Sequence, residues 1–183
     1  MLEKIITQLL TAIGEDPARE GLQDTPGRVA RSLKGELLSG YGQDPSSIFT
    51  VFSNETYDQM VVLRDIEFYS MCEHHMLPFF GRATIAYLPT DKVVGISKLA
   101  RLLDIYSKRL QIQERLTDQI TKAIEDNLNP QGAACIIEAT HFCMVARGVK
   151  KQNSIMVTSS LTGIFRESGL ARNEIMEIFN HKR

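Results

Sequence analysis

Two short segments hold most of the chain's cysteine and histidine, and the fold must bring them together. They are Cys72-Glu73-His74-His75 and His141-Phe142-Cys143, and of the three cysteines and four histidines in the chain they contain all but one of each. Thiolate and imidazole are ligands that zinc prefers, and a catalytic zinc keeps three protein ligands while water takes its fourth position. The two segments therefore predict a metal site.

The third cysteine has a different setting. Cys135 lies in the apolar run Ala133-Ala134-Cys135-Ile136-Ile137, with no histidine nearby, and free cysteine often acts as a small buried hydrophobic residue. We expect Cys135 in the core. Adjacent histidines that follow Cys-Glu, in a segment that turns at Pro78, make a poor core element, so a metal is favoured over packing there.

Composition limits the class of protein. The chain has 183 residues, 43% of them hydrophobic, which is typical of one globular domain. Its net charge of −1 gives no overall positive field that would attract nucleic acid. The first ten residues mix charge with apolar residues and predict an amphipathic helix, with no signal peptide and no membrane span. Three cysteines without paired spacing argue against a disulfide framework, so we expect a reducing, cytoplasmic setting.

Helical patterns predict an N-terminal helical region over residues 1–58. Apolar residues recur at helical spacing from Leu2 to Ile13, and Gly14 ends the run. A second helix is expected to start with Thr25 as N-cap and Pro26 at its first position. Neither helix has a core of its own, so the pair should pack on the main body or on a neighbouring subunit.

The remaining residues, 59–183, predict an α+β region, and we expect the chain to act as a single functional domain. The order is strand, strand, helix, helix, strand, strand, followed by a short C-terminal helix. The expected ranges are strands 61–70, 81–88, 133–146 and 154–165, and helices 97–108 (capped by Ser97), 112–128 and 172–179. In the third strand His141 and Cys143 would point to the same face.

A sheet of four antiparallel strands, covered by helices on one face, leaves its other face to be explained. The strands carry apolar residues at positions of both parities, as in Ile136-Ile137 and Ile155-Met156-Val157. A lone two-layer subunit would leave apolar surface in water. We therefore expect closed oligomerisation.

Five motifs follow one another along nearly the whole chain. They occupy residues 21–30, 72–75, 95–101 and 111–117, and finally 141–143 together with 146–148. In this order, from about residue 2 onward, the chain resembles the GTP cyclohydrolase I family of the tunnelling fold (T-fold). The resemblance implies a ββααββ subunit with helices on one face, preceded by the helical segment. It also implies a toroidal homodecamer of two stacked pentamers with active sites at the subunit interfaces.

The resemblance also implies a reaction and a metal. Cys72, His75 and Cys143 would hold one Zn²⁺ per subunit, and zinc activates water at neutral pH. The water would attack C8 of the guanine ring of GTP, formate would leave, and 7,8-dihydroneopterin triphosphate would form, the first step toward tetrahydrofolate or another pterin. His141 would protonate N7. His74 would assist in the same pocket, although support of a ligand or simple exposure is an open alternative.

Substrate contacts follow from the same resemblance. Glu114 would accept two hydrogen bonds from guanine, with Gln113 beside it, although either could equally be an ordinary residue of a helix's first turn. The triphosphate would be bound by basic side chains and a helix start, namely Ser97, Lys98, Arg101 and Arg147, with Arg28 as a further contributor. No Walker-type glycine loop occurs, which suits an enzyme that leaves the triphosphate intact.

Two rival interpretations belong to other classes. One is the nitrile reductase of queuosine biosynthesis, another T-fold enzyme. It uses a cysteine nucleophile and a nicotinamide cofactor, so the zinc-type cysteines and histidines of this chain argue against it. The other is a scaffold protein with structural zinc, in which His74 or His141 would supply a fourth ligand. A zinc-free state in which Cys72 and Cys143 oxidise together is also conceivable. We expect neither a nucleic-acid partner nor a membrane.

Overall fold

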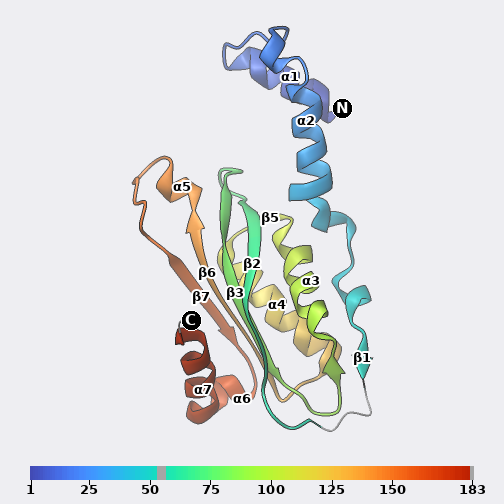
Figure 1. Cartoon of the computed structure of the whole chain (residues 1–183), viewed down its shortest axis with the longest axis vertical. Helices are drawn as coiled ribbons and strands as arrows, with labels where there is room; N and C mark the ends of the chain where they lie inside the picture. The colour runs from blue at the N-terminus through green and yellow to red at the C-terminus, as the bar shows by residue number, and fades with distance from the viewer. Residues whose placement is uncertain (53–56, 182–183) are drawn as a thin grey trace.

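A computed structural model describes residues 1–52 and 57–181 (Figure 1). The N-terminal helices are α1 (Leu2–Ala12) and α2 (Thr25–Ser32), the π-helix η2 (Leu33–Leu37), and the 3-10 helices η1 (Glu20–Leu22), η3 (Ser39–Gly42) and η4 (Pro45–Ile48). The principal elements of the body are β2 (Val61–Cys72), β3 (Pro78–Leu88), α3 (Ile96–Ser107), α4 (Gln113–Leu128), β6 (Gly132–His141), β7 (Met156–Leu161) and α7 (Gly169–Asn180). Short elements join them: β1 (Val51–Phe52), β4 (Val93–Val94), β5 (Leu110–Gln111), α5 (Phe142–Val145) and α6 (Ile164–Glu167).

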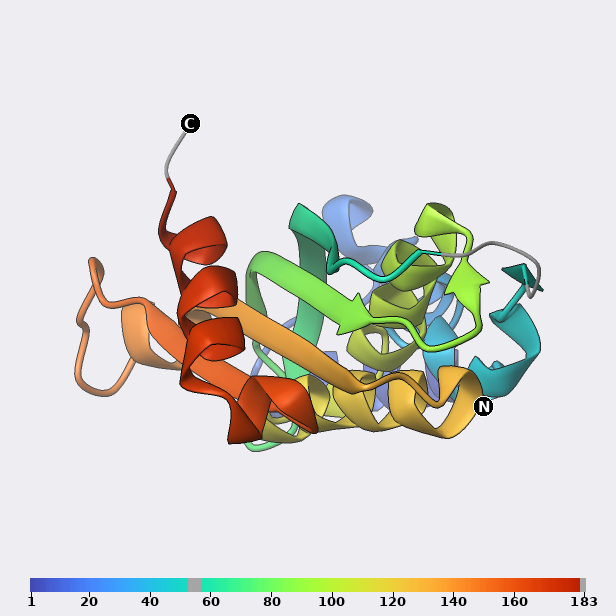
Figure 2. The same cartoon turned by 90° about the horizontal axis from the view of Figure 1, so that it is seen from below.

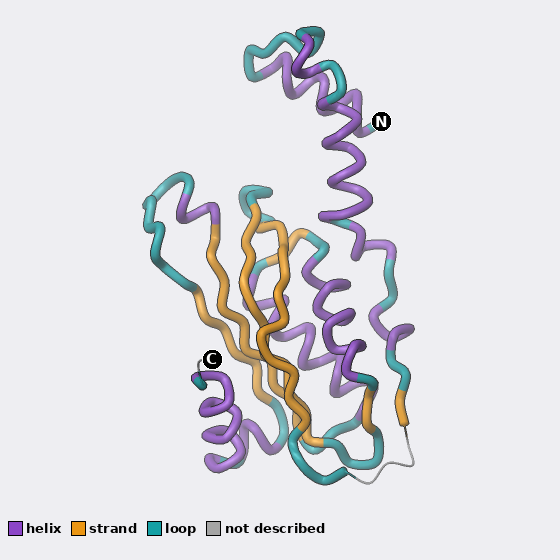
Figure 3. The backbone as a smooth tube through the Cα atoms, viewed as in Figure 1, coloured by secondary structure: helices purple, strands orange, loops and turns teal. Residues whose placement is uncertain are grey.

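Helices α1 and α2 form an arm that projects beyond the sheet (Figures 1 and 3), whereas η3 and η4 lie against α3. α1 packs against α2, and the chain returns to the body where η3 contacts α3. Ile5, Leu9 and Ile13 of α1 are 51%, 52% and 66% exposed. The arm therefore does not pack on the main body, and its apolar side lies open in the single chain. The predicted boundary between 1–58 and 59–183 stays a prediction, and residues 53–56, 182 and 183 within these regions lie outside the described residues.

The main sheet has the order β5-β2-β3-β6-β7, and its four long strands pair antiparallel. The short β5 pairs parallel to the end of β2, with Met71 opposite Leu110 and Cys72 opposite Gln111. β1 and β4 form a separate two-stranded pair. The predicted α+β class is confirmed.

Alternation along the strands gives the sheet two different faces. On the first face, Phe79 and Ile85 pack with Leu99 of α3 and with Leu116 and Ile124 of α4 in the main core. The sequence predicted helices on one face only, but part of the second face is also covered. A smaller core packs there. Its buried members are Ala86, Ala134 and Ile136 of the sheet with Phe165 and Ile175 of α6 and α7. Seen from below, α7 and α3 lie on opposite sides of the molecule (Figure 2).

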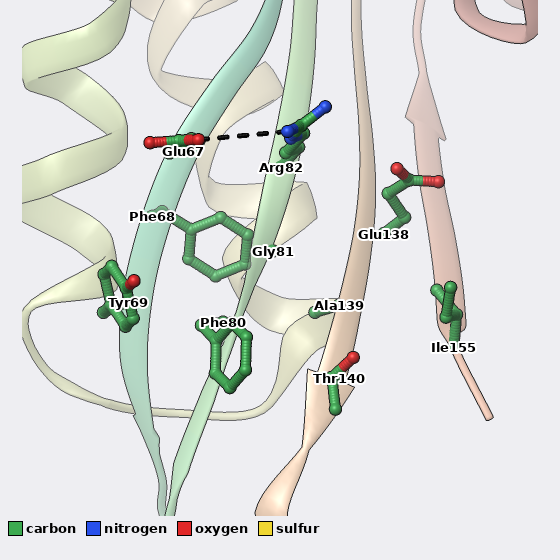
Figure 4. Close-up of a pocket in the computed structure, with 10 residues that line it drawn as sticks. All are labelled: Glu67, Phe68, Tyr69, Phe80, Gly81, Arg82, Glu138, Ala139, Thr140 and Ile155. Atoms are coloured by element: carbon green, nitrogen blue, oxygen red, sulfur yellow. Dashed lines mark ion pairs between the residues drawn. The ribbon is translucent and has the colours of Figure 1, made fainter. Parts of the chain in front are cut away.

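The rest of the second face is open. A hollow of about 330 Å³ lies over it (Figure 4), lined by Glu67, Phe68, Tyr69, Phe80, Gly81, Arg82, Glu138, Ala139, Thr140 and Ile155. Tyr69 stacks on Phe80 at 5.6 Å between ring centroids, yet Tyr69 is 66% and Ile155 61% exposed. The single chain therefore leaves apolar surface on this part of the sheet, as the strand pattern predicts.

Several boundaries differ from the predicted ones; the fourth strand, expected over 154–165, ends at Leu161 because the chain turns into α6 at Ile164. β6 ends at His141 and the chain turns into α5, so Cys143 is not on the strand. His141 pairs with Phe79 of β3. Pairing ends there because the residue before Phe79 is Pro78, the first residue of β3, which lacks a backbone N–H. Ser97 and Thr25 are not N-caps. The N-cap of α3 is Gly95 and that of α2 is Asp24, so Ser97 and Thr25 lie inside their helices.

Candidate metal centre

Several elements end or begin at one end of the sheet, the upper end in Figure 1. We call it the metal end and define it as residues 72–78, 110–114 and 141–147. The pairing fixes this arrangement, because the end of β2 lies beside β5, which leads into α4, and the start of β3 lies beside the end of β6. Residues that are distant in sequence thus meet through the sheet itself.

The turn between β2 and β3 positions two of the predicted ligands. The backbone N–H of Cys72 donates to Leu77 O at 2.8 Å, and that of Met76 donates to Cys72 O at 2.8 Å. Met76 has a φ of 52°, a left-handed conformation that tightens the turn. Arg115 of α4 donates to the Glu73 carboxylate, and this hydrogen bond lowers the pKa of Glu73. The turn is therefore tied to α4.

The predicted ligands Cys72, His75 and Cys143 meet at the metal end. Their ligand atoms all lie within 4.8 Å of one another, and a tetrahedral zinc with Zn–S bonds of about 2.3 Å separates its sulfur ligands by roughly 3.8 Å. Burial raises the pKa of the Cys143 thiol, and the adjacent Cys72 raises it further. A divalent cation would offset both effects, since it favours the thiolates. This group could bind a metal ion.

His141 lies beside the ligand group and is held on two sides. It is 9% exposed, and its ring stacks on Phe79 with centroids 4.6 Å apart and planes 3° apart. Its Nε2 lies 2.8 Å from Oε1 of Gln113. Burial lowers the pKa of His141, and the Glu114 carboxylate acts in the opposite direction. The ring is therefore fixed in place and keeps its neutral form to a lower pH than a free histidine.

Three more of the predicted residues lie at the same end. Nδ1 of His74 is 3.9 Å from Sγ of Cys72, and the His74 side chain is exposed. Glu114 is exposed in the first turn of α4, directly after the buried Gln113. Arg147, two residues after α5, is exposed and close enough for its charge to act on Cys143. The single chain thus gathers the metal ligands, His141 and these three side chains.

The basic residues of α3 lie elsewhere. Because α3 leads into β5, its last residue, Ser107, is the one near the metal end. At about 1.5 Å per residue, Lys98 lies roughly 14 Å back along the helix axis, and Ser97 and Arg101 share the same half of the helix. Arg28 is on the arm and pairs with Asp24 at 3.1 Å. One chain does not bring these four residues to the metal end.

Sequence reasoning did not find the contacts that hold the site. Phe79 and Arg115 carried no signal beyond an apolar strand position and a surface charge. For Gln113 the sequence suggested contact with a substrate, whereas its side chain is 1% exposed and bonds within the protein. Its role as a direct substrate contact stays a prediction.

Comparisons with known proteins agree on one family. A family model described as GTP cyclohydrolase I matches residues 2–180. The chain is 54% identical over 181 residues to "GTP cyclohydrolase 1" of Wolinella succinogenes, which covers 98% of this chain and 96% of that protein. It is 51% identical over 183 residues to the protein of the same name from Gloeobacter violaceus, which covers 100% of this chain and 85% of the relative.

One solved structure shows a more distant likeness. It is described as archaeosine synthase QueF-Like in the apo form, and it matches with a TM-score of 0.49 and 15% identity over 60% of this chain and 97% of that one. A similarity at this level supports no statement about activity. Among the helices that the structure describes, none is both long enough and apolar enough to cross a membrane.

Proposed function

The chain belongs to the GTP cyclohydrolase I family and is an enzyme of that family, and from this premise we propose zinc-dependent hydrolysis of GTP at guanine C8. In the net reaction GTP and one water give formate and 7,8-dihydroneopterin triphosphate. The product would serve the synthesis of tetrahydrofolate or another reduced pterin, in a cytoplasm that keeps thiols reduced. The observation that carries the proposal is the Cys72, His75 and Cys143 group beside the buried His141.

The donor set suits one Zn²⁺ per subunit. Two sulfurs and one imidazole are typical of a zinc site that leaves a position for water. When bound there, the ion would activate water as a nucleophile at neutral pH and act as a Lewis acid. Cys72, His75 and Cys143 would hold it, and the hydrogen bonds of the 72–78 turn would keep Cys72 and His75 in position.

His141 would move the proton that the ring opening requires. C8 of guanine is a weak electrophile, and protonation of N7 makes it a better one. A histidine fixed by stacking and by a hydrogen bond can deliver a proton to a defined atom. His74, exposed beside Cys72, would assist from the solvent side of the same pocket.

Glu114 would select the base. Its carboxylate can accept from N1–H and from the exocyclic amine of guanine, whereas adenine offers no such pair of donors. A site built for these donors leaves buried acceptors unpaired with the wrong base, which costs on the order of 10⁴-fold in specificity. Glu114 is available for this role because it is exposed at the metal end.

The triphosphate would lie between subunits. Arg147 is at the metal end, but Ser97, Lys98 and Arg101 start α3 at the other end of the sheet and Arg28 is on the arm. A neighbouring chain could bring these residues to the metal end. This supports association of several chains, as do the exposed apolar residues of α1 and of the open sheet face. The family resemblance implies that the assembly is a homodecamer of two pentamers.

A turnover assay tests the proposal. Zinc-loaded protein is incubated with GTP, formate is measured enzymatically, and the pterin is measured by its fluorescence after oxidation. We expect equal amounts of formate and pterin with GTP, and neither product with ATP or after removal of the metal. A well-folded, zinc-loaded protein that releases no formate from GTP would refute the proposed reaction.

A further inference from the structure

We propose that Gln113 is a positioning residue that fixes which nitrogen of His141 carries the proton. The inference rests on the proposed function in so far as His141 is the proton-transfer group. The structure itself carries it, through a set of hydrogen bonds from α4 to β6 and β7 whose donors and acceptors can all be assigned. Gln113 would then act on the reaction through His141.

The assignment starts at two threonines. Thr117 Oγ1 lies 2.7 Å from the backbone oxygen of Gln113, and since a carbonyl oxygen only accepts, the Thr117 hydroxyl donates there. Thr117 Oγ1 also lies 2.6 Å from Thr158 Oγ1. Because the proton of Thr117 is already used, Thr158 donates to Thr117. The remaining contact of Thr158, with the Gln113 side chain, must then be one that Thr158 accepts.

The Gln113 amide can face these groups in only one orientation. Its Nε2 lies 3.1 Å from each of three oxygens, those of Ile137 O, Met156 O and Thr158 Oγ1. All three accept, so they share the two N–H groups of the amide. The flipped amide would put Oε1 against two carbonyl oxygens. Oε1 of Gln113 therefore faces His141.

The orientation of the amide decides the tautomer of His141. Oε1 of Gln113 has no proton to give, so at 2.8 Å it accepts from Nε2–H of His141. A neutral imidazole that holds its proton on Nε2 has a bare Nδ1. Nδ1 is then the ring nitrogen with a free lone pair, and the stack on Phe79 sets the plane in which it points.

The burial of Gln113 separates this role from direct binding. Its side chain is 1% exposed, and both ends of its amide are engaged within the protein. In triads that use histidine, the group behind the ring likewise holds the tautomer and leaves the chemistry to the imidazole. We therefore expect Gln113 to affect turnover and to leave GTP binding nearly unchanged.

The test combines a proton position with a matched pair of variants. Neutron diffraction of the metal-loaded wild-type protein, at a pH where His141 is neutral, locates the deuteron on its ring. Steady-state kinetics compare Gln113→Met, which keeps the side-chain length and removes the acceptor, with Thr121→Val. Thr121 Oγ1 contacts Ser160 Oγ at 2.7 Å, so the control removes a hydrogen bond between α4 and β7 that does not reach His141.

We expect a deuteron on Nε2 and none on Nδ1. For Gln113→Met we expect kcat to fall roughly 10- to 100-fold with KM for GTP near the wild-type value, the usual effect of losing the partner behind a functional histidine. Thr121→Val should keep the wild-type kcat.

Three results would overturn the proposal. One is a deuteron on Nδ1 with Nε2 bare. Another is wild-type kcat in Gln113→Met, or a rise in KM alone, which would make Gln113 a binding residue. The last is an equal loss of kcat in Thr121→Val. If the wild-type protein does not convert GTP, the proposed function fails, but the deuteron position still decides the tautomer. The deuteron position also decides it if Gln113→Met does not fold.

Discussion

The metal end and the start of α3 differ in how much one chain completes by itself. At the metal end, strand pairing and hydrogen bonds bring Cys72, His75, Cys143 and His141 together within a single subunit. The start of α3 carries Ser97, Lys98 and Arg101 at the other end of the sheet. The candidate metal group is thus built into the subunit fold, whereas the proposed nucleotide site would need a second chain.

This difference divides the expected effects of substitution. In the proposed reaction the groups at the metal end act on the reacting atoms, so we expect a change there to lower kcat. The basic residues at the start of α3 would bind a remote part of the substrate, so we expect a change there to act mainly on KM.

The largest effect is expected for Cys143→Ala. Loss of a metal ligand removes several kcal/mol of transition-state stabilisation, so kcat/KM should fall roughly 10³-fold or more. The variant should also lose its bound zinc, which mass spectrometry measures. Cys135→Ala is the matched control. Cys135 is fully buried and its burial raises the pKa of its thiol, so it should keep its zinc and its turnover. Retention of zinc and turnover by Cys143→Ala would remove Cys143 from the metal site.

The next effect is expected for His141→Ala with the metal retained. Loss of a general acid lowers kcat by about 10²- to 10⁴-fold, which single-turnover formate release would measure. His181→Ala is the control, since His181 is exposed and follows α7, outside the metal end. A His141→Ala protein that loses zinc as Cys143→Ala does would instead make His141 a ligand.

Glu114→Gln should change selectivity more than folding. The amide offers one acceptor where the carboxylate offers two, so we expect kcat/KM for GTP to fall about 100-fold, with lost hydrogen bonds to a charged group worth about 1.5–3 kcal/mol. Competition between GTP and an adenine nucleotide measures the selectivity. Glu125→Gln, on the same helix but away from the metal end, should behave as wild type. Unchanged preference for guanine in Glu114→Gln would contradict the assignment.

The smallest effect is expected for Lys98→Ala. Removal of one phosphate contact should raise KM about tenfold, because a hydrogen bond to a charged group is worth about 1.5 kcal/mol or more, and kcat should stay near wild type. Lys108→Ala, at the opposite end of α3, is the control. If Lys98→Ala instead lowered kcat alone, the start of α3 would belong with the reacting groups.

The sequence was sufficient for the parts that depend on local pattern. Clustering of cysteine and histidine predicted a metal site, and the family resemblance named Cys72, His75 and Cys143 as its ligands. Runs of strand-forming residues predicted the long strands, and helical spacing predicted the two helices that cover them. The apolar run around Cys135 predicted its place in the core, where it is fully buried.

The rest depends on contacts between elements. The end of β6 at His141 follows from where β3 begins, and the smaller core around Ile175 follows from the path of the chain after β7. The hydrogen bond between Gln113 and His141 joins α4 to β6, and no spacing within either element encodes it. The distance of Lys98 from the metal end likewise depends on the direction of α3.

Mixed oligomers test most directly whether the site is divided between chains. Cys143→Ala subunits and Lys98→Ala/Arg101→Ala subunits, each with its own affinity tag, are co-expressed and purified through both tags. GTP turnover is then measured at low substrate concentration, where each parent is nearly inactive. If a metal end meets the α3 start of a neighbour, random mixing makes about a quarter of the sites fully wild type, and turnover should rise to about that fraction. Turnover no higher than the mean of the two parents would contradict the account.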